Sequence, residues 1–291
     1  MSVGHRNACR KTEWVQHGPA LMMELSGVRI HTTAVIDPSA RIAPTATVGP
    51  FCVIGPDVVI GSNVRIDSHA IIEGGVVVEE ESHVGAGVVI HGSAVIGSST
   101  SIFPYAVIGQ TGQFPGHHNS DGKVVIEGEC VIREFVIINK SVTSPATRVG
   151  RGCYLMARTQ IDHDCILSPY VKTATGVTLG GSVHVEDHAY LGMNSVVHQG
   201  LRIGRACMIG MNGVVKAHVP PFTTLVDRRI NRINVIGLTR LGASEEDITR
   251  VEAFYRGKRD ELLVRIGSDP WIDAIENFVA QVAPDRMELF A

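Results

Sequence analysis

The feature that most constrains this chain is a six-residue period of aliphatic residues through its middle. Starting at Ile36, every sixth position up to Ile108 is Ile or Val. The period returns in the same phase at Ile126. After a second break it runs from Val149 to Val215, where Thr173 is its one non-aliphatic member. A register held over so many units indicates a repeat protein.

Small residues follow the aliphatic ones at a fixed distance. Ala40, Ala46, Cys52 and Ala70 each lie four residues after an aliphatic position, and Gly or an acidic residue often follows that position directly. A six-residue unit is one short strand and a turn, and three units make a triangular coil whose narrow interior suits small side chains. Stacked coils pair as parallel strands, and each coil depends on its neighbours. The sequence therefore predicts a parallel β-helix.

Two loops and two Pro residues divide the chain. The loops are residues 110–122 and 139–148, and Pro220 and Pro221 end the last repeat. Beyond them, Ser244 before three acidic residues predicts a helix N-cap, and Asp269 before Pro270 predicts the start of another helix. We expect three parts: an extension without regular structure at 1–24, the β-helix at 25–221, and a small helical domain at 222–291.

Composition argues against several classes of protein. The net charge is -3 and no basic run stands out, which argues against a nucleic-acid binder. No apolar stretch reaches transmembrane length, and His17, Gly18 and Pro19 interrupt any signal-peptide pattern. The six cysteines show no CxxC spacing, so we expect reduced residues of the core. We expect a cytoplasmic protein without membrane insertion, with Met22 or Met23 as a plausible start.

Residues from about 30 to 242 resemble the bacterial UDP-N-acetylglucosamine O-acyltransferase family of lipid A synthesis, within the hexapeptide-repeat acyltransferases. The similar segments are residues 48–56 (VGPFCVIGP), 132–134 (IRE), 161–165 (IDHDC), 197–199 (VHQ), 219–221 (VPP), Asn234 and 237–240 (GLTR). The hexapeptide pattern is associated with left-handed winding. The resemblance thus implies a left-handed parallel β-helix with a small C-terminal α-helical domain.

The resemblance also implies a reaction. An acyl chain carried as a thioester on acyl carrier protein is transferred to a hydroxyl of UDP-N-acetylglucosamine, the first step of lipid A biosynthesis. This chemistry needs a base for the hydroxyl and donors for the thioester oxyanion. The family's active sites lie between the subunits of a homotrimer, and it uses no metal or other cofactor.

The family's site residues map onto nine positions of this sequence. His163 matches the general base, a suitable role because an ordinary imidazole has a pKa near ~6.5. Asp164 matches the residue that orients it, and Gly181 matches the oxyanion donor. The expected substrate-binding residues are Gln113, His198, Gln199, Asn234 and Arg240, and Met211 matches the residue that limits acyl length. A bulky residue at Met211 predicts a shorter acyl chain than glycine would.

Five positions depart from the family pattern, three of them outside the first loop. Gln160 and Ser182 stand where the family has histidines, and Ile236 stands near an expected sugar-binding glutamate. In the first loop, Phe114 and Gly116 replace polar or basic residues. The general base is kept while expected acceptor contacts change. An acyltransferase for another nucleotide-linked aminosugar, or one that uses acyl-CoA, therefore stays open.

Rival interpretations exist for single residues and for the whole chain. Gly181 is also compatible with a plain turn, and Arg228, Arg229 and Arg232 are alternative phosphate ligands near Arg240. His184 and His188 lie about 13 Å apart along a strand, too far for one zinc ion. A γ-class carbonic anhydrase uses the same fold but gives no reason for the C-terminal helices. A non-catalytic trimeric scaffold is the third alternative.

Overall fold

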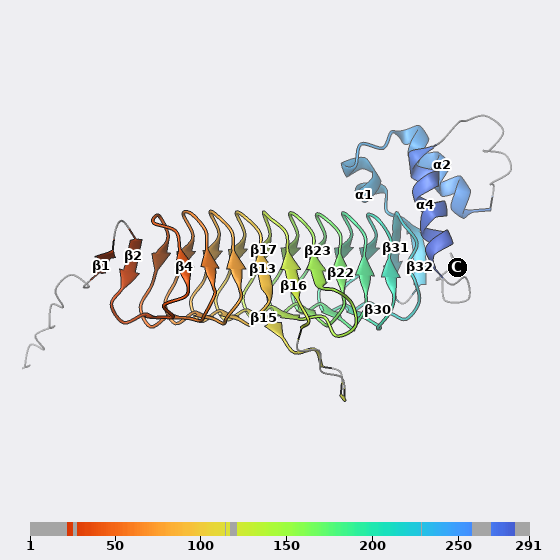
Figure 1. Cartoon of the computed structure of the whole chain (residues 1–291). Coiled ribbons are helices and arrows are strands. Elements are labelled where there is room, and N and C mark those ends of the chain that lie inside the picture. Colours follow the sequence, from red (N-terminus) through yellow and green to blue (C-terminus); the bar gives the residue numbers. More distant parts are fainter. Residues whose placement is uncertain are drawn as a thin grey trace, which may run out of the picture.

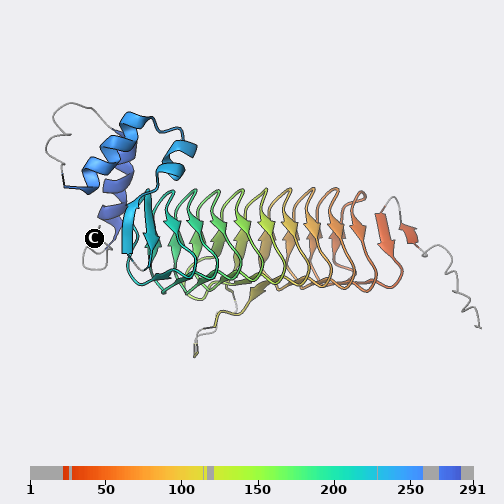
Figure 2. The ribbon, with the colours of Figure 1, turned by 180° about the vertical axis from the view of Figure 1, so that it is seen from behind.

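The computed structural model describes residues 22–25, 28–113, 115–116, 121–227, 229–257 and 269–282. They form a long solenoid with helices at one end (Figure 1; Figure 2 shows the other side). The coils stack into three flat sheets, and the fold is the left-handed parallel β-helix that the resemblance implies.

Each coil contributes one strand to each sheet in a fixed order. The first sheet has thirteen strands among the described residues. They are β1 (Met22–Leu25), β2 (Val28–His31), β5 (Thr47–Val48), β8 (Arg65–Ile66), β11 (His83–Val84), β14 (Ser101–Ile102), β17 (Val131–Ile132), β20 (Tyr154–Leu155), β23 (Lys172–Thr173), β26 (Tyr190–Leu191), β29 (Met208–Ile209), β31 (Thr223–Val226) and β32 (Arg229–Ile233).

The second and third sheets have ten and nine described strands. The second holds β3 (Val35–Ile36), β6 (Val53–Ile54), β9 (Ile71–Ile72), β12 (Val89–Ile90), β15 (Val107–Gln110), β18 (Ile137–Asn139), β21 (Gln160–Ile161), β24 (Thr178–Leu179), β27 (Val196–Val197) and β30 (Val214–Val215). The third holds β4 (Arg41–Ile42), β7 (Val59–Ile60), β10 (Val77–Val78), β13 (Ala94–Ile96), β16 (Val124–Ile126), β19 (Thr147–Val149), β22 (Ile166–Leu167), β25 (His184–Val185) and β28 (Arg202–Ile203).

The interior follows the predicted period. The aliphatic residue of each repeat lies at or near the end of its strand and is buried from Val48 onward, and the small residue of the turn lies beside it. Five cysteines occupy such interior positions as free thiols: Cys52, Cys130, Cys153, Cys165 and Cys207. Because each coil repeats the one before it in register, an aliphatic ladder fills the solenoid from end to end.

The helices follow the β-helix and pack on its last coils. They are α1 (Val235–Arg240), α2 (Glu245–Tyr255) and α4 (Pro270–Gln281). Ser244 caps α2 in a capping box with Asp247, and Asp269 caps α4 ahead of Pro270, as predicted. A second apolar cluster joins these helices to the last coils, with Phe222 edge-on to Trp271. No helix among the described residues has the length and hydrophobicity to cross a bilayer.

Two details differ from the expected division of the chain. Met22, Met23 and Glu24, expected to lack regular structure, belong to β1, which pairs antiparallel with β2; residues 1–21 lie outside the described residues. Past Pro221 the first sheet gains two more strands, β31 and β32, before α1 begins. They form a hairpin whose β31 continues the parallel ladder from β29. The domain limits themselves stay a prediction.

Candidate active site

One edge of the solenoid carries most of the predicted catalytic residues. It is formed by the turns from the second sheet to the third, after β15, β18, β21, β24 and β27, and we call it the loop edge. Both loops that interrupt the period lie here, on successive coils. His163, Gly181 and Gln199 follow at intervals of eighteen residues, one coil each, so they are stacked along this edge.

The turns of the loop edge are held to one another by their backbones. Ser182 N–H donates to His163 O at 2.8 Å, and Gly200 N–H donates to Gly181 O at 2.9 Å. The residue that donates has a positive φ, 59° in Ser182 and 69° in Gly200, which makes the corner tight. This stacking fixes the backbone on which the candidate catalytic side chains stand.

His163 and Asp164 form the central pair of the site. Nδ1 of His163 lies 2.8 Å from Oδ2 of Asp164, whose side chain is 3% exposed. Burial alone would raise the pKa of Asp164, but hydrogen bonds from Ser144, His163 and Thr143 hold that pKa well below its ordinary value. Asp164 is therefore an ionised acceptor, so the hydrogen of the pair belongs to Nδ1 and the neutral ring has its lone pair on Nε2.

Gly181 lies directly against the ring of His163. Its N–H donates no hydrogen bond to any described residue, whereas the N–H groups of Gly180 and Ser182 on either side both have acceptors. A backbone N–H beside the candidate base is the kind of donor that an oxyanion needs.

The first loop reaches His163 through a carboxylate that the sequence interpretation missed. Oδ1 of Asp162 accepts from the N–H of Gln113 at 3.4 Å, from Asn139 Nδ2 at 2.9 Å and from the N–H of His163 at 2.8 Å. Gly112 packs against both His163 and Val142. The signal was in the sequence, because Asp162 and Asn139 each come directly after an aliphatic repeat position on the same edge.

His198 and Gln199 lie on the loop edge, two coils beyond His163. Both are exposed, and Nδ1 of His198 lies 3.1 Å from the carbonyl oxygen of Gln199. The backbone of Gln199 packs against Gly180, in the next turn toward His163. The structure thus brings Gln113, His163, Asp164, Gly181, His198 and Gln199 to one edge.

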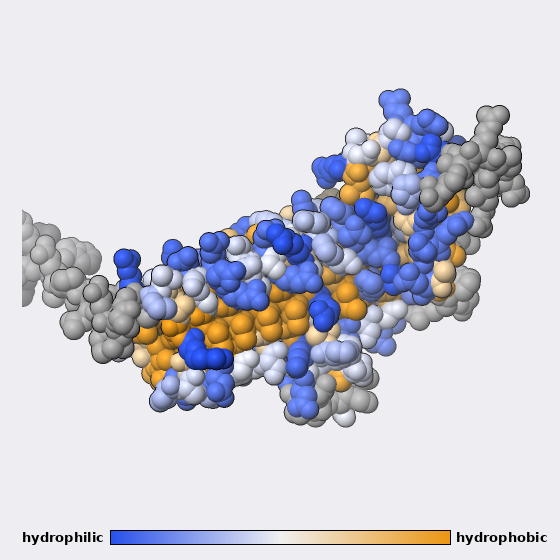
Figure 3. Space-filling model, turned by 45° about the horizontal axis from the view of Figure 1, so that its top comes forward, coloured by the Kyte–Doolittle hydropathy of each residue, from blue (hydrophilic) through white to orange (hydrophobic). Residues whose placement is uncertain are grey.

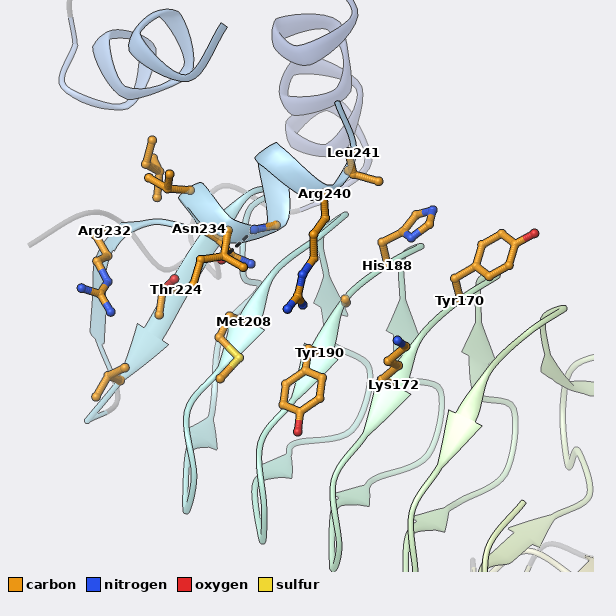
Figure 4. A pocket seen from close by; sticks show the side chains of 16 residues that line it. Tyr170, Lys172, His188, Tyr190, Met208, Thr224, Arg232, Asn234, Arg240 and Leu241 are labelled. Carbon is orange, nitrogen blue, oxygen red and sulfur yellow. Dashed lines mark hydrogen bonds between the residues drawn. The ribbon is translucent and has the colours of Figure 1, made fainter. Parts of the chain in front are cut away.

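Asn234 and Arg240 lie elsewhere, at a pocket between the first sheet and α1. This cavity of about 930 Å³ has three cationic side chains in its wall, from Lys172, Arg232 and Arg240, and no carboxylate among the described residues that line it (Figure 4). Tyr170 and Tyr190 add aromatic rings. Arg228 is outside the described residues.

The turns of the loop edge join the other two sheets, so within one chain this pocket and His163 belong to different sides of the solenoid.

The amide of Asn234 is engaged within the fold. Nδ2 donates to Ala206 O at 2.8 Å, and Oδ1 accepts from Gly237 N–H at 3.1 Å as the N-cap of α1. Asn234 therefore has a structural role in the pocket wall, as the N-cap of α1, independent of any ligand of the pocket. Met211 is in a third place, the turn after β29, with 73% of its surface exposed.

The three departures from the family pattern outside the first loop lie on both sides of the molecule. Gln160 projects from β21 and is half-buried, and the N–H of Ser182 is tied to the turn of His163. Ile236 is 66% exposed in the wall of the pocket. The changed positions therefore border both the loop edge and the pocket.

The fold and the His–Asp pair together define a class, the hexapeptide-repeat acyltransferases. Residues 182–217 match the model described as hexapeptide repeat of succinyl-transferase, and residues 30–114 match the GMPPB C-terminal domain. The acyl-[acyl-carrier-protein]–UDP-N-acetylglucosamine O-acyltransferase of Alkalilimnicola ehrlichii is 35% identical over 54% of this chain and 67% of its own length. The enzyme of the same name from Herminiimonas arsenicoxydans is 40% identical over 43% of this chain and 49% of its own.

A solved structure extends the similarity to nearly the whole molecule. The UDP-N-acetylglucosamine acyltransferase of Francisella novicida is 30% identical, with a TM-score of 0.72 over 90% of this chain and 94% of that one. The sequence alignments themselves span from about half to two thirds of the curated relatives. The chain belongs to the UDP-N-acetylglucosamine O-acyltransferase family.

Proposed function

We propose that this protein transfers an acyl chain from acyl carrier protein to a hydroxyl of UDP-N-acetylglucosamine, the first step of lipid A biosynthesis. The observation that carries the proposal is the pairing of His163 with an ionised, buried Asp164 on the loop edge of a member of this family. The proposed location is the cytoplasm.

The proposed chemistry uses three groups of this chain. Nε2 of His163 takes the proton of the acceptor hydroxyl as its oxygen attacks the thioester carbonyl carbon. The Gly181 N–H stabilises the oxyanion, and Asp164 stabilises the imidazolium through Nδ1. When the carbon–sulfur bond breaks, the thiolate of the carrier takes the proton from His163 and leaves as a free thiol.

We infer that the active site needs a second copy of the chain. Within one chain the cationic pocket with Arg240 is on a different side from His163, although an anionic nucleotide and the base must act on one acceptor. Figure 3 shows an apolar band along the β-helix. Outward residues of the second sheet include Val35, Val53 and Ile71, which are 65%, 41% and 40% exposed. A homotrimer that covers such rows would bring one subunit's His163 to the next subunit's pocket.

Specific residues favour a different acceptor as the alternative substrate. Ile236 places an apolar side chain in the wall of the pocket, near the position of an expected glutamate, and Gln160 and Ser182 replace histidines near the base. Another nucleotide-linked aminosugar fits these changes, and acyl-CoA is the alternative donor.

A thiol-release assay tests the proposal. Several acyl chain lengths on acyl carrier protein, and acyl-CoA, are offered with UDP-N-acetylglucosamine and with other nucleotide sugars. Release that requires UDP-N-acetylglucosamine and falls by about 10²–10⁴ in His163→Ala supports the proposal. His69→Ala is the control, because His69 is an exposed histidine on a different edge. Release with another acceptor alone would change the substrate, and release unaffected by His163→Ala would refute the base.

A further inference from the structure

The loop between β18 and β19 is longer than a regular turn of the repeat. Eleven positions separate Ile138 from Val149, whereas six separate Ile161 from Leu167. Its extra residues lie on the loop edge, one coil before His163. Neither the hexapeptide pattern nor the proposed acyl transfer explains why they are there.

The structure shows what these residues contact. Oδ1 of Asp164 accepts from the N–H groups of Val142 at 3.0 Å, Thr143 at 3.1 Å and Ser144 at 2.7 Å. The Ser144 hydroxyl donates to the same oxygen at 2.7 Å, and the Thr143 hydroxyl donates to Oδ2 at 3.0 Å. The N–H of Asp164 donates in turn to Thr147 Oγ1 at 2.9 Å. The loop therefore holds the carboxylate of Asp164, and Thr147, the first residue of β19, holds its backbone.

These contacts restrict how the carboxylate can turn. The terminal torsion of an aspartate is broad, so an unrestrained carboxylate samples many orientations. A carboxylate has about four lone-pair sites, and here the loop donors and Nδ1 of His163 occupy both oxygens. Rotation would break several short, charge-assisted hydrogen bonds together. Oδ2 is therefore kept on the side that faces His163.

We propose that Thr143 and Ser144 are positioning residues that act on His163 through Asp164. Their hydroxyls orient the carboxylate, and the carboxylate keeps the hydrogen of the neutral imidazole on Nδ1. The lone pair is thus kept on Nε2, the atom that must accept the proton. This proposal rests on the role of His163 as the base in the proposed function.

Kinetics of hydroxyl-deletion variants test the proposal. Thr143→Val with Ser144→Ala removes both hydroxyls and leaves the three backbone donors. We expect kcat to fall about 10-fold while KM for both substrates stays within about twofold, because orientation of the base matters in the transition state. Thr143→Ser and Ser144→Thr keep a hydroxyl and should retain kcat. Wild-type kcat in the double variant would overturn the proposal.

A control separates positioning from damage to the loop. Ser141 is buried in the same loop, and its hydroxyl accepts from Lys123 N–H at 3.1 Å. Ser141→Ala should lower the melting temperature without the loss of kcat. An equal loss of kcat in Ser141→Ala would show that the loop acts through stability alone.

Histidine nitrogen NMR tests the tautomer without any substrate. The ¹⁵N signals of His163 are identified by their absence in His163→Gln. In the wild-type protein they should be those of the Nδ1–H tautomer, and in the double variant they should shift toward a mixture of the two tautomers. Unchanged signals would overturn the proposal. Because no acceptor or donor is present, this result stands even where the proposed reaction fails.

Discussion

The imidazole of His163 lies so close to Gly181 that no side chain fits at position 181 unless the ring moves. A Cβ atom on Gly181 would be 2.4 Å from Cε1 of His163 and 2.5 Å from Nε2. Favourable contacts between carbon atoms are about 3.5–4.0 Å long. Glycine at this position is therefore a steric condition for the orientation of the candidate base, in addition to its proposed role as oxyanion donor.

Gly181→Ala is expected to displace the ring and lower kcat by about 10²-fold, since small misplacements of reacting groups have effects of that size. The fold should persist, because the new methyl group meets a side chain that can move. Steady-state kinetics and circular dichroism check this. Gly200→Ala is the control: it is on the same edge, its φ of +69° strains an alanine, and its new Cβ would meet nothing within 4 Å, so it tests backbone strain without a clash. Comparable loss of kcat in the control would contradict the steric explanation.

Two inactive variants should complement each other if the active site is shared between subunits. His163→Ala lacks the base, and Arg240→Ala lacks a cation of the pocket on the other side. Co-expressed subunits that mix at random should regain up to about a quarter of wild-type activity, because about one site in four then has both residues intact. Mixed trimers, isolated with two affinity tags and assayed, should reach about a third, because one of the three sites in each then has both residues intact. No gain above the separate variants would place both residues in the site of a single chain.

His184 should make the protein less stable in mild acid. Burial, together with the charge of Arg202, lowers the pKa of His184 to about 4. Between an unfolded pKa near ~6.5 and this value, the unfolded state binds a proton that the folded state does not. The free energy of unfolding should therefore decrease as the pH falls from about 6.5 to about 4. Urea unfolding should show a weaker dependence in His184→Gln and an unchanged one in His69→Gln; identical curves for all three proteins would refute the assignment.

Met211 is expected to limit acyl length. Its side chain is 73% exposed at the turn after β29, and the family resemblance matches it to the residue that limits acyl length. Met211→Gly should shift the preference toward a longer chain, read as kcat/KM across acyl carrier proteins with chains of different length. Met211→Leu, which keeps the bulk, should retain the wild-type preference. A wild-type protein that prefers the longest donor would contradict the prediction.

The fold was predictable because the six-residue period indicates which residues point into the β-helix. The inward positions from Val48 to Ile138 and from Val149 to Val215 each follow from a six-residue count, and the N-caps of α2 and α4 follow from Ser244 and Asp269. The hairpin of β31 and β32 was missed because Pro220 and Pro221 interrupt the period. Its strands are held by antiparallel pairing, which has no six-residue signature.

The site was predictable only in part because resemblance identifies residues but not their side of the solenoid. The eighteen-residue spacing of His163, Gly181 and Gln199 does place them on one edge. The donors from Thr143 and Ser144 had no such signal, since they come from an insertion whose path no repeat count describes. Arg240 was expected near the same substrate, and its place at the end of α1 became clear from the packing of the helices.

The two ends of the first sheet affect how copies of this protein can meet. Parallel coils end in a strand edge that would accept another coil of the same kind, and such edges are templates for fibres. Here the first sheet ends in an antiparallel pair on both sides, β1 with β2 and β31 with β32. A neighbouring molecule therefore meets a strand of the wrong direction to continue the parallel ladder. The hairpins thus oppose head-to-tail growth and favour association along the sides of the solenoid.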